Sequence, residues 1–296
     1  MAERVASVSA RTVSNLQPPI SNLPMSFSTE RHLRQEIVRV GKLLYDKGLI
    51  VATDGNVSAR LDANRILATP SGLCKGFMEP EQLIVVDLDG NRIGPTNPAN
   101  RSLKPTSEMR MHLEAYRRRP DIGAVVHAHP STTVALSIAG IDLAQCLIPE
   151  VIVTLGVVPT TQYATPSSEE NARAIRELIA GHDAIVLQRH GTLTVGRDPL
   201  DAFLKTESIE QMSRVAFMAR LLGASPVLPP EEVVKLIAQR EALGLSRSTD
   251  AGDFCVHCGV CHLPDRHIVP AAWNLDEAAI VREVTERVLK RMMNAE

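Results

Sequence analysis

Apolar residues recur at helical spacing near the beginning of the chain. The stripe comprises Leu33, Ile37, Val40 and Leu44. Intervals of three and four positions place these residues on one face of a helix, which Ser28 or Thr29 can cap and Gly48 ends. Capping residues and apolar spacing predict further helices over 106–119, 131–139, 167–182, 198–222 and 229–243. Asp198 is the predicted cap of the helix over 198–222.

Short apolar runs bounded by turn residues predict strands between these helices. The runs cover 66–72, 83–91, 122–130, 151–161 and 184–191. Asp89-Gly90-Asn91 is typical of a hairpin turn. Because helices alternate with strands, we expect one α/β domain with a mixed sheet over 28–245. Residues 1–27 are rich in Ser, Pro and Asn without periodicity, and we interpret them as a flexible arm.

The amino-acid composition argues against some classes of binding partner. The 296 residues are 44% hydrophobic and 22% charged, with a net charge of −2 and 3% aromatics. These values argue against a general nucleic-acid or membrane-surface partner. No apolar run approaches the ~18–20 residues that span a bilayer. The five cysteines are an odd number without a secretory segment, which predicts reduced thiols and a cytoplasmic location.

Two histidines lie one residue apart at the end of the strand over 122–130. His127 and His129 point to the same face of that strand, and His190 follows another strand at its turn. Three imidazoles with one open coordination position are typical of a catalytic zinc site. Alternatively, His127 packs in the core and His129 caps a turn. His112, within a helix, and His182, in a connecting turn, are poorer candidates.

Five short motifs occur in order along the chain: GNVSAR, ATPSG, PTSE, VVHAHP and LQRHG. Together they resemble the class II aldolase family over roughly residues 30–225. The resemblance implies an α/β fold of three layers, α/β/α, with a mixed, mostly antiparallel central sheet. It further implies a cyclic homotetramer, and a zinc ion on His127, His129 and His190.

The same resemblance assigns roles around the metal. Glu108 matches the family's catalytic acid/base, although a glutamate in a first helical turn also favours the helix dipole. Residues matching the phosphate cradle are Gly55, Asn56, Ser71, Gly72, Thr106 and Ser107. Hydroxyls, an amide and free backbone N–H groups suit a phosphate dianion, yet each residue taken alone is ordinary for a turn or cap.

These roles imply cleavage of a ketose 1-phosphate, such as L-fuculose or L-rhamnulose 1-phosphate, to dihydroxyacetone phosphate and lactaldehyde. A metal-dependent decarboxylase of sugar-acid phosphates, or another lyase on the same fold, is the alternative.

The chain departs from the family at the position after the histidine strand where a tyrosine is expected, because Val153 occupies that position. Tyr163 is a substitute candidate as proton donor, and Glu150 is a speculative site residue.

The chain beyond residue 245 has a different composition. Cys255, Cys258 and Cys261 are spaced by two residues in a segment, 246–274, that we interpret as a linker. With His262 or His267 they could form a second metal site, although zinc modules usually have two separated pairs. Residues 275–296 predict an amphipathic helix.

A short amphipathic helix behind a linker needs a groove to cover its apolar face. The segment 275–296 resembles the encapsulation peptides of bacterial microcompartments, whose shell or cargo proteins would be its partners. Alternatively, it packs on the body of its own chain. A non-enzymatic role as a microcompartment assembly adaptor is a further hypothesis, against which the intact Glu108 and three histidines argue.

Overall fold

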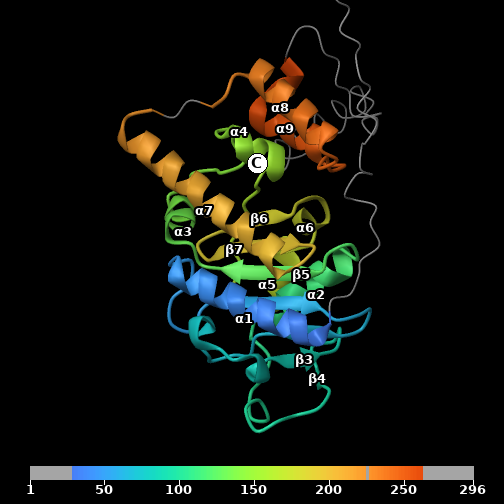
Figure 1. Cartoon of the computed structure of the whole chain (residues 1–296). Helices are drawn as coiled ribbons and strands as arrows, with labels where there is room; N and C mark the ends of the chain where they lie inside the picture. Colours follow the sequence, from blue (N-terminus) through green and yellow to red (C-terminus); the bar gives the residue numbers. More distant parts are fainter. Residues whose placement is uncertain (1–28, 225–226, 263–296) are drawn as a thin grey trace, which may run out of the picture.

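A computed structural model describes residues 29–224 and 227–262 (Figure 1). The predicted arm 1–27, the candidate ligand His267 and the predicted helix 275–296 lie outside the described residues. The strands are β1 (Asn56–Arg60), β2 (Ile66–Ala68), β3 (Ile84–Val86), β4 (Arg92–Ile93), β5 (Ala124–Ala128), β6 (Ala184–Leu187) and β7 (Gly191–Gly196). They form one sheet in the order β4-β3-β2-β1-β5-β7-β6, and each neighbouring pair is antiparallel.

The helices are α1 (Glu30–Asp46), α2 (Met109–Arg118), α3 (Ser131–Ile138), α4 (Pro149–Thr154), α5 (Glu169–Ile175), α6 (Leu178–Gly181), α7 (Pro199–Leu221), α8 (Pro230–Ala242) and α9 (Asp250–Cys258). Short 3₁₀ turns lie at Lys75–Phe77, Pro80–Gln82 and Val260–His262. Within the described ranges, no helix combines the length and apolar character that crossing a bilayer requires.

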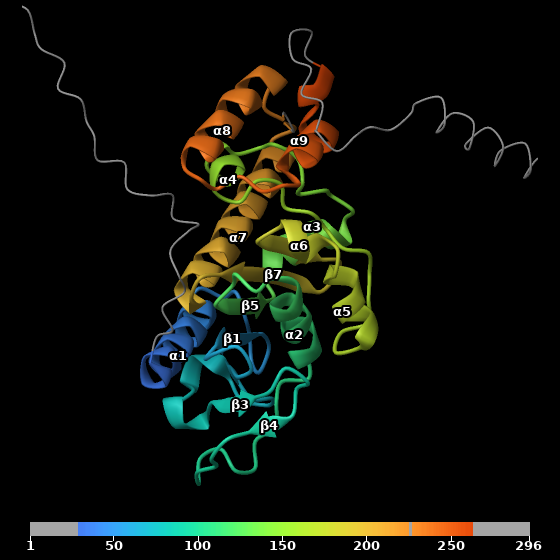
Figure 2. The same cartoon turned by 90° about the vertical axis from the view of Figure 1, so that its right-hand side faces the viewer.

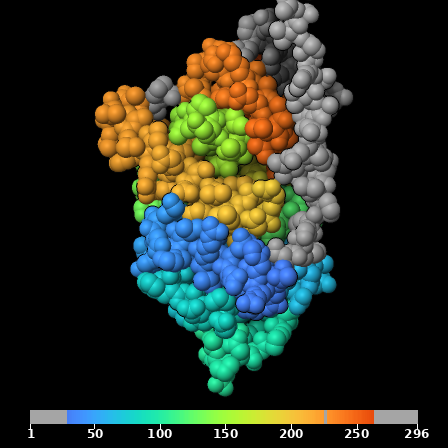
Figure 3. Space-filling model, viewed as in Figure 1, coloured from blue at the N-terminus to red at the C-terminus, as the bar shows by residue number. Residues whose placement is uncertain are grey.

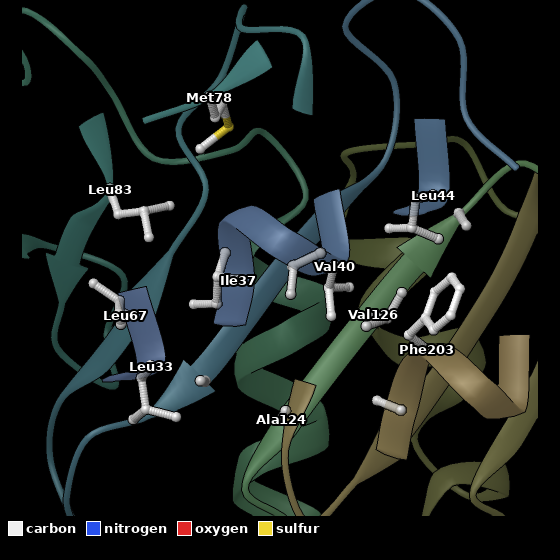
Figure 4. Packing of buried hydrophobic residues seen from close by; sticks show 14 of the residues in the cluster. Leu33, Ile37, Val40, Leu44, Leu67, Met78, Leu83, Ala124, Val126 and Phe203 are labelled. Carbon is white, nitrogen blue, oxygen red and sulfur yellow. The ribbon is translucent and has the colours of Figure 1, made fainter. Parts of the chain in front are cut away.

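Helices cover both faces of the sheet, as the three-layer prediction requires. Figure 2 shows α1 on one side of the sheet and α2 with α5 on the other. On the α1 side the predicted stripe is buried against Val126 of β5 and Phe203 of α7 (Figure 4). On the other side Val125 joins the apolar residues of α2, α5 and α6. Successive side chains of β5 therefore alternate between the two apolar cores, and His127 points toward the side of the sheet that α2 covers.

Two predicted elements differ in the structure. Residues 151–154 of the expected strand 151–161 belong instead to α4 (Pro149–Thr154). Pro149 starts a helical turn, and Val151, Ile152 and Leu155 are buried at helical spacing. The single helix expected over 167–182 is divided into α5 and α6. The predicted strand runs do not cover β1, β4 or, beyond Gly191, β7.

The ordered body extends past residue 245. Helices α4, α8 and α9 gather at one end of the molecule (Figure 1) around a separate apolar cluster that includes Phe254 and Cys258. Arg240 of α8 is 2% exposed and donates to Asp250 of α9 at 2.8 Å. The predicted linker therefore begins, within the described chain, with a packed helix.

Candidate metal and substrate site

The two predicted strand histidines lie at the carboxyl end of β5, in the middle of the sheet. His127 is fully buried, and its Nδ1 lies 2.8 Å from the carbonyl oxygen of Thr192 on β7. A carbonyl accepts only, so Nδ1 carries the proton and Nε2 keeps a free lone pair. His129 Nε2 lies 2.9 Å from that atom, and His129 Nδ1 lies 3.4 Å from Asp54 Oδ2.

His190 comes to the same place from the tight turn between β6 and β7. Arg189 in this turn has a φ of 59°, a left-handed conformation that costs a non-glycine residue free energy. At the next position, a Cβ on Gly191 would lie 2.2 Å from the carbonyl oxygen of Ala128. Only glycine therefore lets this turn approach β5, and the His127 and His190 ring centroids are 4.7 Å apart.

Glu108 completes the cluster from the beginning of α2. Its two carboxylate oxygens lie 3.1 Å from His127 Nε2 and 3.2 Å from His190 Nε2. One donor atom from each of Glu108, His127, His129 and His190 lies within 4.8 Å of the others. The structure thus brings together all four residues that the sequence singled out for metal binding and proton transfer.

The charges of this cluster are tightly linked. Burial alone would raise the pKa of Glu108, but His127, His190 and Asn56 outweigh it and hold the pKa well below its usual range. Burial and the neighbouring His127 and His190 lower the pKa of His129 to about 4. The carboxylate is therefore ionised and the His129 imidazole neutral near pH 7, which are the forms that bind a metal ion.

The donor set fits a divalent cation. Glu108 Oε1 is buried and makes no hydrogen bond, and a buried acceptor without a partner is costly. Two imidazole Nε2 atoms also face each other there. Three imidazoles and a carboxylate are ligands that zinc and similar ions accept. A cation among these atoms would satisfy the lone pairs that the protein leaves facing one another.

A buried polar network, which the sequence did not predict, supports Glu108 from behind. Asn56 Nδ2 donates to Glu108 Oε2 at 2.9 Å, and Asn56 Oδ1 lies 2.5 Å from His112 Nε2. The other ring nitrogen of His112 lies 2.7 Å from Ser58 Oγ, which in turn contacts the Tyr116 hydroxyl. Burial lowers the pKa of His112 to about 3, so its ring is neutral and donates through Nε2 to the amide oxygen.

The residues of the predicted phosphate cradle lie on three segments beside this cluster. Asn56 pairs with His127 across β1 and β5. A Cβ on Gly55 would lie 2.6 Å from Ile50 Cγ2 and 2.9 Å from the His127 carbonyl oxygen, so this position requires glycine. An isolated bridge, Pro70 to Pro105, and the bond from Ser71 N to Lys104 O join the other two segments. Ser71, Gly72 and Ser107 are exposed, whereas Thr106 is buried and accepts from Glu108 N.

The remaining candidates are not among the four clustered residues. Glu150 is exposed in the first turn of α4, and the carbonyl of Val153 accepts from Arg240. The Tyr163 side chain is 58% exposed. His182 bonds to Asp253 of α9 at 3.0 Å, away from the four-residue cluster. Lys75, which no motif indicated, is buried and donates to the carbonyl of Thr53, one residue before Asp54.

The cysteine prediction needs two corrections. The structure joins Cys255 to Cys261 and Cys258 to Cys146 as disulfides, so among the described cysteines Cys74 alone is free, contrary to the expectation of reduced thiols. His262 is exposed, and the fourth group beside the three cysteines is Cys146. Its distance along the chain, 112 residues from Cys258, concealed it in the sequence.

Comparisons with known proteins agree with this geometry. A family model described as Class II Aldolase and Adducin N-terminal domain matches residues 35–217. An L-fuculose phosphate aldolase of Methanococcus maripaludis is 36% identical over 183 residues, 62% of this chain and 95% of the relative. A 3-oxo-tetronate 4-phosphate decarboxylase of Escherichia coli is 31% identical over 202 residues, 67% of this chain and 91% of the relative. The crystal structure of L-fuculose-1-phosphate aldolase from Thermus thermophilus matches with a TM-score of 0.56 at 33% identity, covering 66% of this chain and 98% of that structure.

Proposed function

The chain belongs to the class II aldolase and adducin family and is a metal-dependent lyase, and we propose that it cleaves a carbon–carbon bond in a ketose 1-phosphate. The substrate class is L-fuculose or L-rhamnulose 1-phosphate, and the products are dihydroxyacetone phosphate and lactaldehyde. The observation that carries this proposal is the convergence of Glu108 with His127, His129 and His190.

The clustered side chains have two proposed roles, metal binding and proton transfer. We assign His127, His129 and His190 as the ligands, with zinc as the ion. A divalent ion held by these residues would supply Lewis-acid stabilisation of negative charge on the substrate oxygens. Glu108 touches two of the imidazoles and is ionised, so it can take a proton from the substrate or return one to carbon.

The exposed polar segments are assigned to the phosphate. Ser71, Gly72 and Ser107 present hydroxyl and backbone N–H groups at the surface, next to the buried Thr106 and to Asn56. Such groups bind a dianion without needing a lysine or arginine. Because Asn56 donates to Glu108, its contribution is to orient the carboxylate, and Gly55 contributes backbone only.

A decarboxylase is the second candidate, since the 3-oxo-tetronate 4-phosphate decarboxylase of Escherichia coli matches 67% of this chain. Loss of carbon dioxide from a 3-oxo acid also leaves negative charge beside a carbonyl, which the same ligands and the same carboxylate would serve. The two candidates differ in their substrate and in the group that leaves, which is an aldehyde for the aldolase and carbon dioxide for the decarboxylase.

One assay separates them. The full-length chain is incubated in turn with L-fuculose 1-phosphate, L-rhamnulose 1-phosphate and 3-oxo-tetronate 4-phosphate, with and without a chelator. The proposal predicts dihydroxyacetone phosphate and lactaldehyde from at least one ketose phosphate, and no product after chelation. Carbon dioxide from the third substrate, with both ketose phosphates unchanged, would replace the aldolase with the decarboxylase.

Oligomerisation is a separate part of the proposal. The second half of α7 carries exposed apolar side chains, and Figure 3 shows this end of the helix projecting from the body. They include Phe217, Met218, Leu221 and Leu222. We propose that they are covered in a homotetramer. Light scattering should report a tetramer that Leu221→Asp dissociates. Leu243→Asp, at an exposed apolar position that follows α8 directly, should leave the tetramer intact. A monomeric wild type would contradict the proposal.

The segment 275–296 keeps its proposed role in targeting a cytoplasmic microcompartment. Deleting these residues should leave turnover unchanged and abolish co-localisation with shell proteins. Unchanged co-localisation would remove this role. A full-length chain without bound metal or turnover that still binds shell proteins would instead favour the assembly adaptor.

A further inference from the structure

Four cysteines, Cys146, Cys255, Cys258 and Cys261, lie together at the junction of α9 and the segment before α4. Cys255 and Cys258 are three positions apart on α9, so their side chains share one helix face. Gly259, with a φ of 70°, ends the helix and turns the chain back. This turn brings Cys261 within 5.1 Å of Cys255, measured between Cα atoms.

Cys146 enters the same cluster from a distant part of the chain. Its Cα lies 5.6 Å from that of Cys258, and its side chain is 2% exposed. The carbonyl of Cys146 also accepts from Leu228 N, one residue before the turn into α8. Two cysteine pairs, Cys146 with Cys258 and Cys255 with Cys261, therefore meet on one face of α9. Cys146 and Cys258 are buried in the apolar cluster of Phe254 and Val260.

We propose that these four cysteines, in reduced form, are a structural tetrathiolate metal site that takes zinc. The C-x₂-C-x₂-C run supplies three thiolates, and the fold supplies the fourth from Cys146 instead of His262. Neither the aldolase chemistry nor the histidine cluster requires this site. The inference is therefore independent of the proposed function.

The backbone spacing suits a single ion. Zinc holds four sulfurs at ~2.3 Å in a tetrahedron, so neighbouring sulfurs are about 3.8 Å apart. Cysteines whose Cα atoms are 5.1 and 5.6 Å apart can reach this separation by side-chain rotation. The run alone is also typical of an iron–sulfur cluster, but a four-iron cluster holds its sulfurs further apart than one ion does. Compactness therefore favours zinc.

The conversion of the two disulfides into a metal-bound tetrathiolate site is balanced in atoms and electrons. Reducing the two disulfides takes four electrons and four protons from two dithiol molecules, each of which becomes a disulfide. Zinc then binds the four thiols as thiolates and releases the four protons. The bound ion would link Cys146 to α9 at the place where the Cys146–Cys258 disulfide links them, and so hold α9 beside the segment that leads into α4.

Metal content tests the proposal on the full-length chain. The protein is purified with a dithiol and without a chelator, and its zinc, iron and acid-labile sulfide are measured. The His129→Ala variant, in which the histidine site is disabled, should retain one zinc per chain. Adding Cys146→Ser should remove that zinc, whereas adding His262→Ala or Cys74→Ser should not.

Two results would overturn the proposal. One is a His129→Ala chain that contains no metal and whose four cysteines resist alkylation after dithiol treatment. This result would show that the four cysteines form two permanent disulfides. The other is loss of the zinc in His262→Ala but not in Cys146→Ser. Iron with acid-labile sulfide would keep the tetrathiolate site but refute zinc as its occupant.

A second measurement covers the case in which Cys146→Ser does not fold. Cobalt replaces zinc in the otherwise unaltered, reduced chain, and the sulfur-to-cobalt charge-transfer absorption reports thiolate ligation. A strong band that His129→Ala leaves unchanged supports the cysteine site. Absence of the band in the folded protein contradicts it.

Discussion

His127 Nδ1 lies 2.8 Å from the carbonyl oxygen of Thr192, on the neighbouring strand of the sheet. Because the carbonyl fixes the proton on Nδ1, the Nε2 lone pair of a fully buried imidazole points at His129, His190 and Glu108. The backbone of β7 thus sets the tautomer that metal binding needs.

Removing one imidazole should remove the ion. We expect His127→Ala and His129→Ala to lose the metal at this site and with it turnover, since two histidines bind zinc much more weakly than three. The exposed His32→Ala, on α1, is the matched control and should keep both. Metal analysis with activity measurement checks this, and full metal content in either site variant would refute the ligand assignment.

Glu108 should matter for proton transfer more than for retaining the ion. In Glu108→Gln the three imidazoles remain, so metal stays bound while turnover falls by roughly 10²–10⁴-fold. Glu81→Gln, an exposed carboxylate, is the control. If Glu108→Gln turned over at the wild-type rate, the carboxylate would have no part in the chemistry.

The network behind Glu108 predicts a positioning role for His112. His112→Ala leaves the Asn56 amide oxygen without its donor, so the carboxylate loses its fixed orientation. We expect turnover to fall by up to about 100-fold with metal retained, and His112→Gln, which can still donate, to recover part of it. Equal turnover in the Ala and Gln variants would argue against orientation through this hydrogen bond.

The contact between His182 and Asp253 predicts a pH-dependent stability. Burial opposes the imidazolium, but the hydrogen bond to the Asp253 carboxylate outweighs it and raises the pKa of His182. A raised folded-state pKa gives a stabilisation that is complete below the unfolded pKa of ~6.5 and is lost as pH rises through the folded pKa.

Urea unfolding measures this effect. The free energy of unfolding of the wild type, relative to His182→Gln, should be larger at about pH 6 than at about pH 9. A difference that does not change with pH would mean that His182 is not charged in the folded protein.

The parts of the fold that depend on local spacing could be predicted from the sequence. The stripe on α1 is buried as expected, and His127 and His129 share a face because strand alternation leaves no other choice. Asp198 caps α7 as predicted and accepts from Asp201 N. In each case residues within one turn or one strand decide the outcome.

The errors concern contacts between distant segments. The run of β-branched residues at 151–153 favours a strand locally, but burial of Val151, Ile152 and Leu155 against neighbouring helices makes it α4. The ion pair between Arg240 and Asp250 and the partner of Cys258 are equally invisible without the fold. For the same reason His112 looked like an ordinary helix residue, since its partners Asn56 and Ser58 lie on β1.

Anomalous diffraction at the zinc absorption edge, from crystals of the full-length chain grown with zinc, tests the central claim most directly. The account predicts a peak about 2.0–2.1 Å from one ring nitrogen of each of His127, His129 and His190, beside the Glu108 carboxylate. A fully loaded crystal with no peak among these three imidazoles would contradict it.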